Sequence, residues 1–458
     1  MSASVKKKNS LDMTQGPILG NIIKFVIPLI LGNMLQLLYN AADLIVVGRF
    51  AGSNATAAVG ATGSINTLFV NLCIGLSIGA SVIVSRRIGA KDDDGTHRGV
   101  HTAMGLGIIS GLIGMVIGIL LSKPLLVLFG TPAGEVLDGA TLYMRIFFIG
   151  LPASMVYNFG AAIMRAAGDT KRPLYILSAA GIVNVILNLI LVIVFHMGVA
   201  GVAIATAVAN YISAIAAVIC LCRTNESYKL NVKKIKFYKE ELVESLKIGV
   251  PASIQNSVFS LANMVIQGAV NSFGAEAMAG SAAASNIEGF TYTAMNAFYQ
   301  ATLTSVSQNY GAKDEKRIYK TIWICIASVV IVGFSIGLLT AIFAKPLLSI
   351  YIMDSEEAIA FGTTKIYYLG LPYFLCGIME ILAGALRGIG HSNMGMVNSL
   401  VGACGLRVLW VQFILPLSHT PGMLFVCWPI SWVVVIIAHV GCFLAVRKHS
   451  MHVMRGQA

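Results

Sequence analysis

Long apolar stretches recur along almost the whole chain, separated by short polar connections. An α-helix needs about 20 mainly apolar residues to cross the hydrocarbon core of a bilayer. Windows of this length predict twelve helices, centred near positions 35, 72, 111, 153, 184, 210, 257, 292, 332, 375, 404 and 434. The pattern therefore predicts an all-α integral membrane protein with twelve transmembrane helices.

Short segments of the first half return in the second half. GAKD stands at 89–92 and at 311–314, and KPLL stands at 123–126 and at 345–348. An even number of helices per copy gives both copies the same orientation, related by an axis along the membrane normal. We expect two six-helix lobes and a charged connection, with these limits: N-terminal tail 1–20, N-lobe 21–224, linker 225–242, C-lobe 243–446 and C-terminal tail 447–458.

Charge refines the topology. The formal charge is +12, but 57% of the residues are hydrophobic and only 11% are charged. If the N-terminal KKK segment is cytoplasmic, roughly 26 of the 32 Lys and Arg residues fall on the cytoplasmic side, as the positive-inside rule requires. We therefore expect a lipid bilayer, not nucleic acid, as the partner. We also expect a multi-pass protein of the cell inner (plasma) membrane with both termini cytoplasmic. In this layout Lys365 lies near an outer helix end, and Arg407 alone lies deep in a span.

Motifs for catalysis or resident metals do not occur in the sequence. The eight Cys and eight His residues show no zinc-like spacing. A nucleotide-binding G-x-x-x-x-G-K-[ST] loop does not occur either. We expect a chain that is not an enzyme, with no cofactor and no structural metal.

Polar residues interrupt the first apolar stretch at regular spacing. Asn33, Gln36, Asn40 and Asp43 are three, four and three positions apart, which places them on one helix face. A charged side chain at the bilayer centre costs about 2.5–3.5 kcal/mol and usually marks an ion or substrate path. We expect Asp43 to serve that role. The alternative is a carboxylate near the outer helix end, held by Arg49 or by helix-terminal amides.

The corresponding stretch of the second half keeps a polar face without the acid. Asn256 and Asn263 stand where the first half has Asn33 and Asn40, but Ile266 stands opposite Asp43. The titratable member of this face therefore belongs to one lobe only.

Two other acids occur only in the second half. Glu288 matches Asn66 of the first half, and Glu380 matches Asn158. The spacing of Glu288 and Tyr292 with nearby Ser and Asn residues predicts that Glu288 faces inward. The alternative is that both acids serve helix packing or pair with a basic residue such as Arg387 or Arg407.

Proline lies early in the first helix of each half, at Pro28 and Pro251. Proline inside a helix removes one backbone hydrogen bond and allows a kink. Pro28 is therefore a candidate hinge for the helix that carries Asp43, and a static kink used for packing is the alternative.

Several of these segments resemble one known family. PLILGNMLQLLYNAADLIVVGRFAG, the paired GAKD segments, MRAAGDTKRP, NLILVIVFHMGVAGVAIAT and GALRGIGHS are similar to the multidrug and toxic compound extrusion (MATE) family over almost the whole chain. The resemblance implies a cation-coupled secondary antiporter that exports amphipathic, often cationic compounds by alternating access. It also implies a protein that functions as a monomer.

The resemblance also implies an ion site in the N-lobe. Asp43, at a fixed distance from Pro28, matches the family acid, and Asn158, Asn188 and Thr206 match its companions. Val192 stands where many relatives have a second Asp, and Asn184, one turn before Asn188, is a candidate replacement. The coupling ion is H⁺ or Na⁺, and Na⁺ would bind at Asp43.

Polar and aromatic residues of both halves are the candidates for the substrate cavity: Asn33, Gln36, Tyr39, Asn40, Asn66, Asn256, Asn263, Glu288, Tyr292 and Glu380. The alternative function is that of a lipid-linked oligosaccharide flippase of the same broad superfamily. Such a protein needs Arg and Lys in its cavity to bind pyrophosphate. Arg407 as the single deep basic residue argues against it.

Overall fold

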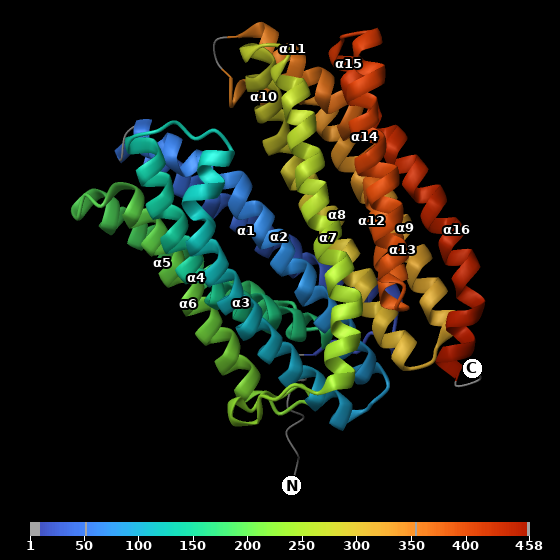
Figure 1. The fold of residues 1–458 in the computed structure, drawn as a ribbon. Coiled ribbons are helices and arrows are strands. Elements are labelled where there is room, and N and C mark those ends of the chain that lie inside the picture. Colours follow the sequence, from blue (N-terminus) through green and yellow to red (C-terminus); the bar gives the residue numbers. More distant parts are fainter. Residues whose placement is uncertain (1–9, 51–52, 353–354, 456–458) are drawn as a thin grey trace. The chain divides into compact units, whose positions relative to one another are not determined.

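The computed structural model describes residues 10–50, 53–352 and 355–455, and these residues form helices and connections without a strand (Figure 1). Pro17 and the polar segment before it precede a helix that continues through Pro28. The helices of the first half are α1 (Ile18–Phe50), α2 (Ser53–Gly89), α3 (Asp93–Leu128), α4 (Glu135–Ala166), α5 (Lys171–Leu189) with the π-helical η1 (Ile190–Val194), and α6 (Gly198–Arg223).

The second half is broken into more pieces. After the short 3₁₀ turn η2 (Val232–Lys234) come α7 (Lys239–Asn271), α8 (Ala275–Gly311), α9 (Glu315–Ile342), α10 (Ala344–Ser349), α11 (Glu356–Lys365), η3 (Ile366–Gly370), α12 (Tyr373–Gly388), α13 (Ser392–Ser399), η4 (Leu400–Gly405), α14 (Leu406–Leu409), η5 (Trp410–Ile414), η6 (Leu415–Leu417), α15 (Pro421–Phe425) and α16 (Cys427–Arg455).

Each predicted helix centre falls inside a helical segment. Nine helical segments of the described chain are long and apolar enough to cross a membrane, and a tenth is formed by the bent pair 356–370 and 373–388. The remaining two centres fall in α7 and α8, which have 33 and 37 residues but carry more polar side chains. Length alone therefore allows them to span a bilayer.

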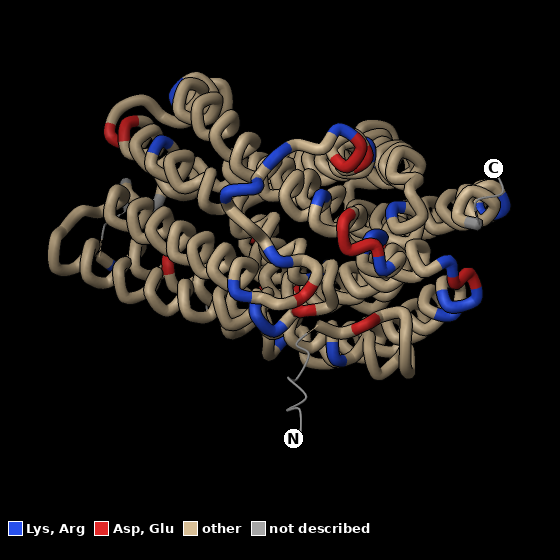
Figure 2. The backbone as a smooth tube through the Cα atoms, turned by 90° about the horizontal axis from the view of Figure 1, so that it is seen from below, with Lys and Arg blue, Asp and Glu red and all other residues tan. Residues whose placement is uncertain are grey.

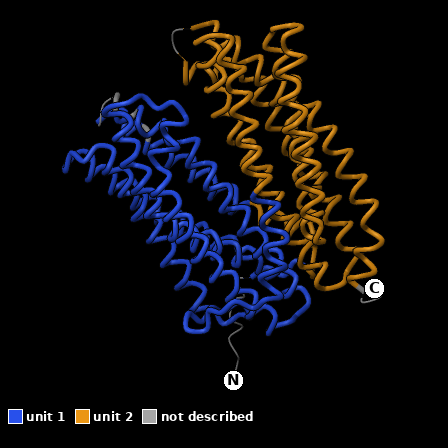
Figure 3. Tube along the Cα trace, viewed as in Figure 1, with its two compact units in different colours: residues 1–13, 27–253 blue, residues 14–26, 254–458 orange. Residues whose placement is uncertain are grey.

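The chain divides into two compact units (Figure 3). The first contains residues 27–253 and the short piece up to Met13, and the second contains 14–26 and everything from Ile254 onward. The units therefore divide inside α1, after Val26, and inside α7, after Ser253. The sequence placed the limits of the lobes near residues 20 and 243. Helix α7 itself begins at Lys239, within the expected linker.

Helix α4 lies at the centre of the first unit and packs against α2, α3 and α6. Its aromatic residues Phe148 and Phe159 are fully buried in the main apolar cluster. Glycines let α3 approach closely, because a Cβ on Gly118 would lie 2.2 Å from the Phe148 ring. This tight packing fixes the polar face of α4 relative to its neighbours.

In the second unit, α12 takes the equivalent place and packs against α8, α9 and α16. The two copies of the GLP segment behave differently. Pro152 lies inside the continuous helix α4, whereas Pro372 separates η3 from α12, where the helix axis bends by 44°. The same tripeptide thus gives a continuous helix in one unit and a broken one in the other.

The two GAKD segments adopt the same turn. Lys91 and Lys313 both have a left-handed backbone, with φ of 56° and 59°. Asp92 then accepts a hydrogen bond of 2.8 Å from the Gly95 amide, and Asp314 accepts one of 2.9 Å from the Arg317 amide. Each aspartate caps the helix that follows. This shared turn is what the sequence duplication predicts.

The connection between α6 and α7 folds against α3. The Asn231 amide donates a hydrogen bond of 3.0 Å to Nε2 of His101, and the Tyr238 amide donates one of 3.2 Å to Oγ1 of Thr102. Tyr228 is only 2% exposed. The linker is therefore an ordered part of the first unit.

Charged residues gather in connections and at helix ends in the view of Figure 2, and most of the helical length is free of them. This distribution suits helices whose middle parts lie in hydrocarbon.

Candidate functional site

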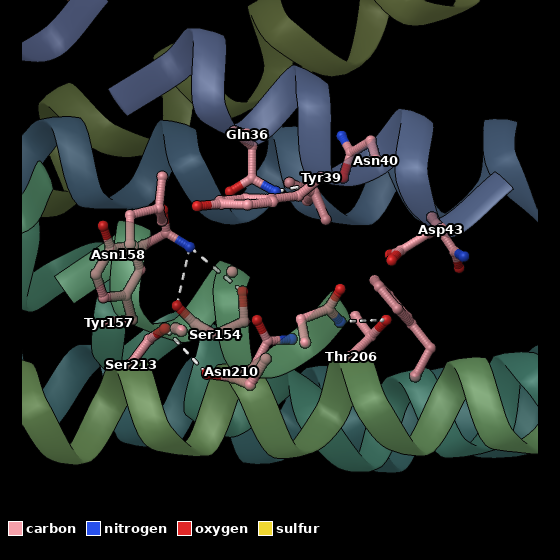
Figure 4. A pocket seen from close by; sticks show the side chains of 18 of the residues that line it. Gln36, Tyr39, Asn40, Asp43, Ser154, Tyr157, Asn158, Thr206, Asn210 and Ser213 are labelled. Atoms are coloured by element: carbon pink, nitrogen blue, oxygen red, sulfur yellow. Dashed lines mark hydrogen bonds between the residues drawn. The ribbon is translucent and has the colours of Figure 1, made fainter. Parts of the chain in front are cut away.

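A cavity of about 560 Å³ opens inside the first unit (Figure 4). Helices α1, α2, α4, α5 and α6 all contribute to its wall. The polar residues among those that line it are Asn33, Gln36, Tyr39, Asn40, Asp43, Asn66, Thr67, Tyr143, Ser154, Tyr157, Asn158, Arg165, Asn184, Thr206, Asn210 and Ser213. The polar face predicted for the first helix therefore faces this cavity.

A chain of hydrogen bonds leads away from Asp43. The Asn188 amide donates to the Asp43 carboxylate and also to Oδ1 of Asn184, the latter over 3.3 Å. Asn184 in turn donates to Oγ1 of Thr206 over 3.4 Å. Asn184 and Asn188 are one turn apart on α5, so both amides point to the same side. The structure thus brings together four of the five residues expected at the ion site.

Asp43 has no fixed cation beside it. Among the residues that the structure describes, Asp43 forms no ion pair, and this includes Arg49, its expected alternative partner. Asn188 is fully buried, and its Oδ1 has no hydrogen-bond partner. A carboxylate largely removed from water needs a counter-charge or a proton. The arrangement therefore offers oxygen atoms to an incoming cation.

Val192, where the family resemblance implies an acid in many relatives, takes no part in this site. It is 1% exposed and packs in an apolar cluster with Val46, Val47 and Val202. The cluster leaves Asn184 as the polar neighbour of Asn188.

Asn158 lines the same cavity but does not join the chain of amides. Its amide donates to the Ser154 carbonyl over 2.8 Å on its own helix. Tyr39 reaches across from α1 and donates to the Ser178 carbonyl of α5 over 3.2 Å, and Gln36 donates to Asn40 over 3.3 Å. Tyr39 thus connects the two helices that carry Asp43 and Asn188.

Sequence reasoning missed part of the cavity wall. Asn210 and Ser213 line the cavity together with Thr206. They follow Thr206 by four and seven positions on α6, so helical spacing alone would have found them. Tyr143 and Arg165 of α4 carry no such signal, because their positions relative to the cavity depend on how α4 packs.

Glu288 has another basic partner than the two that the sequence suggested. Glu288 forms an ion pair of 3.4 Å with Lys365 of α11, so the alternative of a basic partner holds for Glu288 with Lys365 in place of Arg387 or Arg407. Arg387 instead donates to the Tyr299 hydroxyl and, over 2.7 Å, to Oε1 of Gln255. Lys365 is the last residue of α11, which packs against α8.

Three basic residues are buried in the second unit. Lys365 is 6% exposed, Arg387 2% and Arg407 3%. The expectation that Arg407 alone lies deep in a membrane span stays a prediction. Arg407 donates to the Ser431 hydroxyl over 3.0 Å and lies over the Trp428 ring. Basic residues close to helix ends were counted as interfacial from the sequence, but α11 and α12 hold them inside the unit.

The other cavity candidates of the second half lie outside the cavity of the first unit. Asn256 and Glu380 are half-buried, whereas Asn263 and Tyr292 are exposed. The wall of the cavity described above is therefore built from residues of the first unit.

Comparison with known proteins extends these observations. The sequence model of the MatE family matches the chain twice, over residues 28–190 and over residues 251–411. One match in each half agrees with the internal duplication.

Individual proteins are similar over most of their length. The probable multidrug resistance protein YpnP of Bacillus subtilis is 28% identical over 400 residues, which are 86% of this chain and 88% of that protein. The probable multidrug resistance protein NorM of Thermotoga maritima is 25% identical over 428 residues, or 91% and 90% of the two chains. A solved structure of a mutant of the Vibrio cholerae MATE transporter VcmN superposes with a TM-score of 0.88 at 20% identity, covering 95% of this chain and 98% of that one. The last likeness concerns the fold.

Proposed function

This chain belongs to the MatE family of multidrug efflux transporters, and from that premise we propose that it is a secondary antiporter driven by H⁺ or Na⁺. It is a multi-pass membrane protein with no enzymatic role. Its substrates would be amphipathic, often cationic compounds, and it would act as a monomer in the plasma membrane with both termini in the cytoplasm. A single observation supports coupling. The Asp43 carboxylate lines the cavity, and the partner that donates a hydrogen bond to it is the neutral amide of Asn188.

The proposed mechanism is competition within one cavity. A drug with a positive charge is attracted to the unpaired Asp43 carboxylate, and the aromatic rings of Tyr39, Tyr143 and Tyr157 provide apolar surface beside it. Binding of H⁺ or Na⁺ removes that charge, so the drug is held less firmly and leaves. Each ligand therefore lowers the affinity for the other, as linkage requires.

Movement of α1 would couple binding to alternating access. Pro28 interrupts the hydrogen-bond ladder of α1 close to Val26, the last residue of α1 that belongs to the second unit. A bend at Pro28 would shift the helix face that carries Asp43 relative to α5. Such a shift would make or break the bond between Asp43 and Asn188, which connects ion binding to helix position.

Flippase activity is not favoured. Its pyrophosphate substrate needs basic side chains that are free to bind it. Among the residues that line the described cavity, Arg165 is the single Lys or Arg. The buried Lys and Arg residues of the second unit are already engaged: Lys365 with Glu288, Arg387 with Gln255 and Tyr299, and Arg407 with Ser431.

The test of this proposal uses Asp43→Asn protein in liposomes, loaded with a fluorescent cationic dye under an imposed H⁺ or Na⁺ gradient. The substitution keeps the size of the side chain, so the protein should still insert. It removes the charge, so the variant should bind the cationic dye more weakly, H⁺ or Na⁺ should no longer change that binding, and gradient-driven transport should almost vanish. Asp138→Asn is the matched control, because Asp138 is an exposed acid of the same unit outside the cavity. Transport by Asp43→Asn at the wild-type rate would refute the coupling role.

A further inference from the structure

The ammonium group of Lys365 is surrounded by oxygen atoms of one helix face. It donates to Oγ of Ser285 over 2.5 Å and to the carbonyl and hydroxyl oxygens of Ser281 over 3.3 and 3.4 Å. Oε2 of Glu288 lies 3.4 Å away. Positions 281, 285 and 288 of α8 are four and three residues apart, so the same face supplies all four oxygens.

The chemistry of this oxygen set is that of a cation site. Carboxylate, hydroxyl and backbone carbonyl oxygens are the ligands that hard cations take in proteins. The second carboxylate oxygen, Oε1 of Glu288, is buried and has no hydrogen-bond partner among the described residues. Ser285 is exposed, so the site is accessible from one side. The ammonium of Lys365 carries the single positive charge that such a site would otherwise take from solution.

Backbone packing holds Lys365 in place. A Cβ on Gly280 would lie 2.1 Å from the Ala358 carbonyl oxygen, and a Cβ on Gly362 would lie 2.8 Å from the Gly280 carbonyl oxygen. Helices α8 and α11 therefore touch through their backbones about one turn from Lys365. Lys365 has little freedom to withdraw, and it is only 6% exposed.

The first unit lacks the acid of this pair but keeps a basic residue at the equivalent position. RIFFIGLP at 145–152 matches KIYYLGLP at 365–372, so Arg145 is the counterpart of Lys365, and Asn66 is the counterpart of Glu288. Arg145 is exposed and forms no ion pair within the part of the chain that the structure describes. The acid Glu288, and with it the ion pair to Lys365, therefore belongs to the second unit.

We propose that Ser281, Ser285 and Glu288 form a site for a monovalent cation such as Na⁺ and that the Lys365 ammonium occupies it as a tethered cation. The second unit then binds no exchangeable ion. Removal of the ammonium leaves the oxygen ligands in place with one uncompensated negative charge, and the site becomes available to sodium. This statement about binding does not rest on the proposed transport function.

Equilibrium binding of radioactive sodium to the purified full-length protein at alkaline pH tests the proposal. An Asp43→Asn background removes the other candidate site. In that background, Lys365→Met should gain a saturable sodium site, and a further Glu288→Gln substitution should abolish it. Lys345→Met removes an exposed lysine of the same unit and should gain nothing. Lys365→Arg keeps the charge and should also gain nothing.

A second variant guards against misfolding. Lys365→Gln keeps a donor for the serine oxygens while removing the charge, and it should gain the same sodium site if Lys365→Met is not monodisperse. The proposal is overturned if the folded variants bind no sodium and Glu288 is instead protonated, seen as a carbonyl-stretch infrared band that Glu288→Gln removes. It is overturned equally if the Asp43→Asn protein with Lys365 intact already binds sodium in a Glu288-dependent manner. Either result can arise whether or not Asp43 drives transport.

Discussion

Tyr39 of α1 packs directly on Gly181 of α5, where a Cβ would lie 1.9 Å from Cε2 of the tyrosine ring. The same tyrosine donates a hydrogen bond to the Ser178 carbonyl. Only a glycine allows α1 and α5 to be connected in this way while Tyr39 still lines the cavity.

Gly181→Ala should therefore displace the Tyr39 ring and disturb the cavity. Overpacking of this kind typically costs about 1–3 kcal/mol, so we expect a lower unfolding temperature in detergent and weaker dye binding. Thermal unfolding and dye titration measure the two effects. Gly60→Ala is the matched control, since a Cβ at Gly60 meets nothing within 4 Å; equal behaviour of the two variants would contradict the role of this contact.

Asn188→Ala should uncouple transport from the ion gradient. A hydrogen bond to a charged group contributes about 1.5–3 kcal/mol, so its loss at Asp43 should reduce ion-driven export roughly 10- to 100-fold. Dye binding without a gradient should change little. Asn158→Ala separates the roles, because Asn158 bonds within its own helix and its loss should affect dye affinity more than coupling. The reverse pattern would argue against the amide chain as the coupling element.

Gln255 supplies an acceptor to the buried guanidinium of Arg387. Gln255→Leu leaves part of that charge without a partner, which should destabilise the protein by about 1–3 kcal/mol. Gln255→Glu introduces a counter-charge at the same place and should be tolerated far better. Unfolding temperature in detergent distinguishes them, with Gln267→Leu as the control at an exposed position of α7. A Glu variant as unstable as the Leu variant would exclude this electrostatic explanation.

Glu241, at the start of α7, is 1% exposed and accepts a hydrogen bond of 2.8 Å from Nε of Arg98. Glu241→Gln should loosen the connection between α6 and α7. Because Arg98 remains partly exposed, we expect a cost of about 1–2 kcal/mol, seen as faster trypsin cleavage at residues 233–236. Glu240→Gln, at a side chain that is 66% exposed, should leave cleavage unchanged. Equal protection in all three proteins would show that the ion pair does not hold the linker.

Single cysteines test the orientation in the membrane, in a background where the eight native cysteines are replaced. From the distribution of Lys and Arg, Lys233→Cys and Lys316→Cys should react with an impermeant maleimide only from the cytoplasm. Glu135→Cys should react only from outside. All three positions are exposed. Reaction of all three from one side would refute the predicted topology.

Periodicity predicted the elements and the cavity-facing side of α1. The three-four-three spacing of Asn33, Gln36, Asn40 and Asp43 reports local helix geometry, which is why all four residues were placed together correctly. Local pattern carries no information about which side chain of a distant helix will meet a given residue.

The pairing of Glu288 with Lys365 shows that limit. It depends on the close approach of α8 and α11 through Gly280 and Gly362, two glycines with no distinguishing local signal. The different paths at Pro152 and Pro372 are equally non-local, since identical GLP segments are continuous in one packing environment and bent in the other.

Helices α1 and α7 each begin in one unit and end in the other. This arrangement determines which parts of each unit two separate fragments of the chain would contain. The segment from Arg223 to Lys239 lies wholly within the first unit. A cut there would leave residues 14–26 of the second unit on the first fragment and residues 239–253 of the first unit on the second fragment. Each fragment would then lack a piece of its own core that the other retains. Co-expressed halves would have to exchange these segments to fold, and neither half would be a self-sufficient domain.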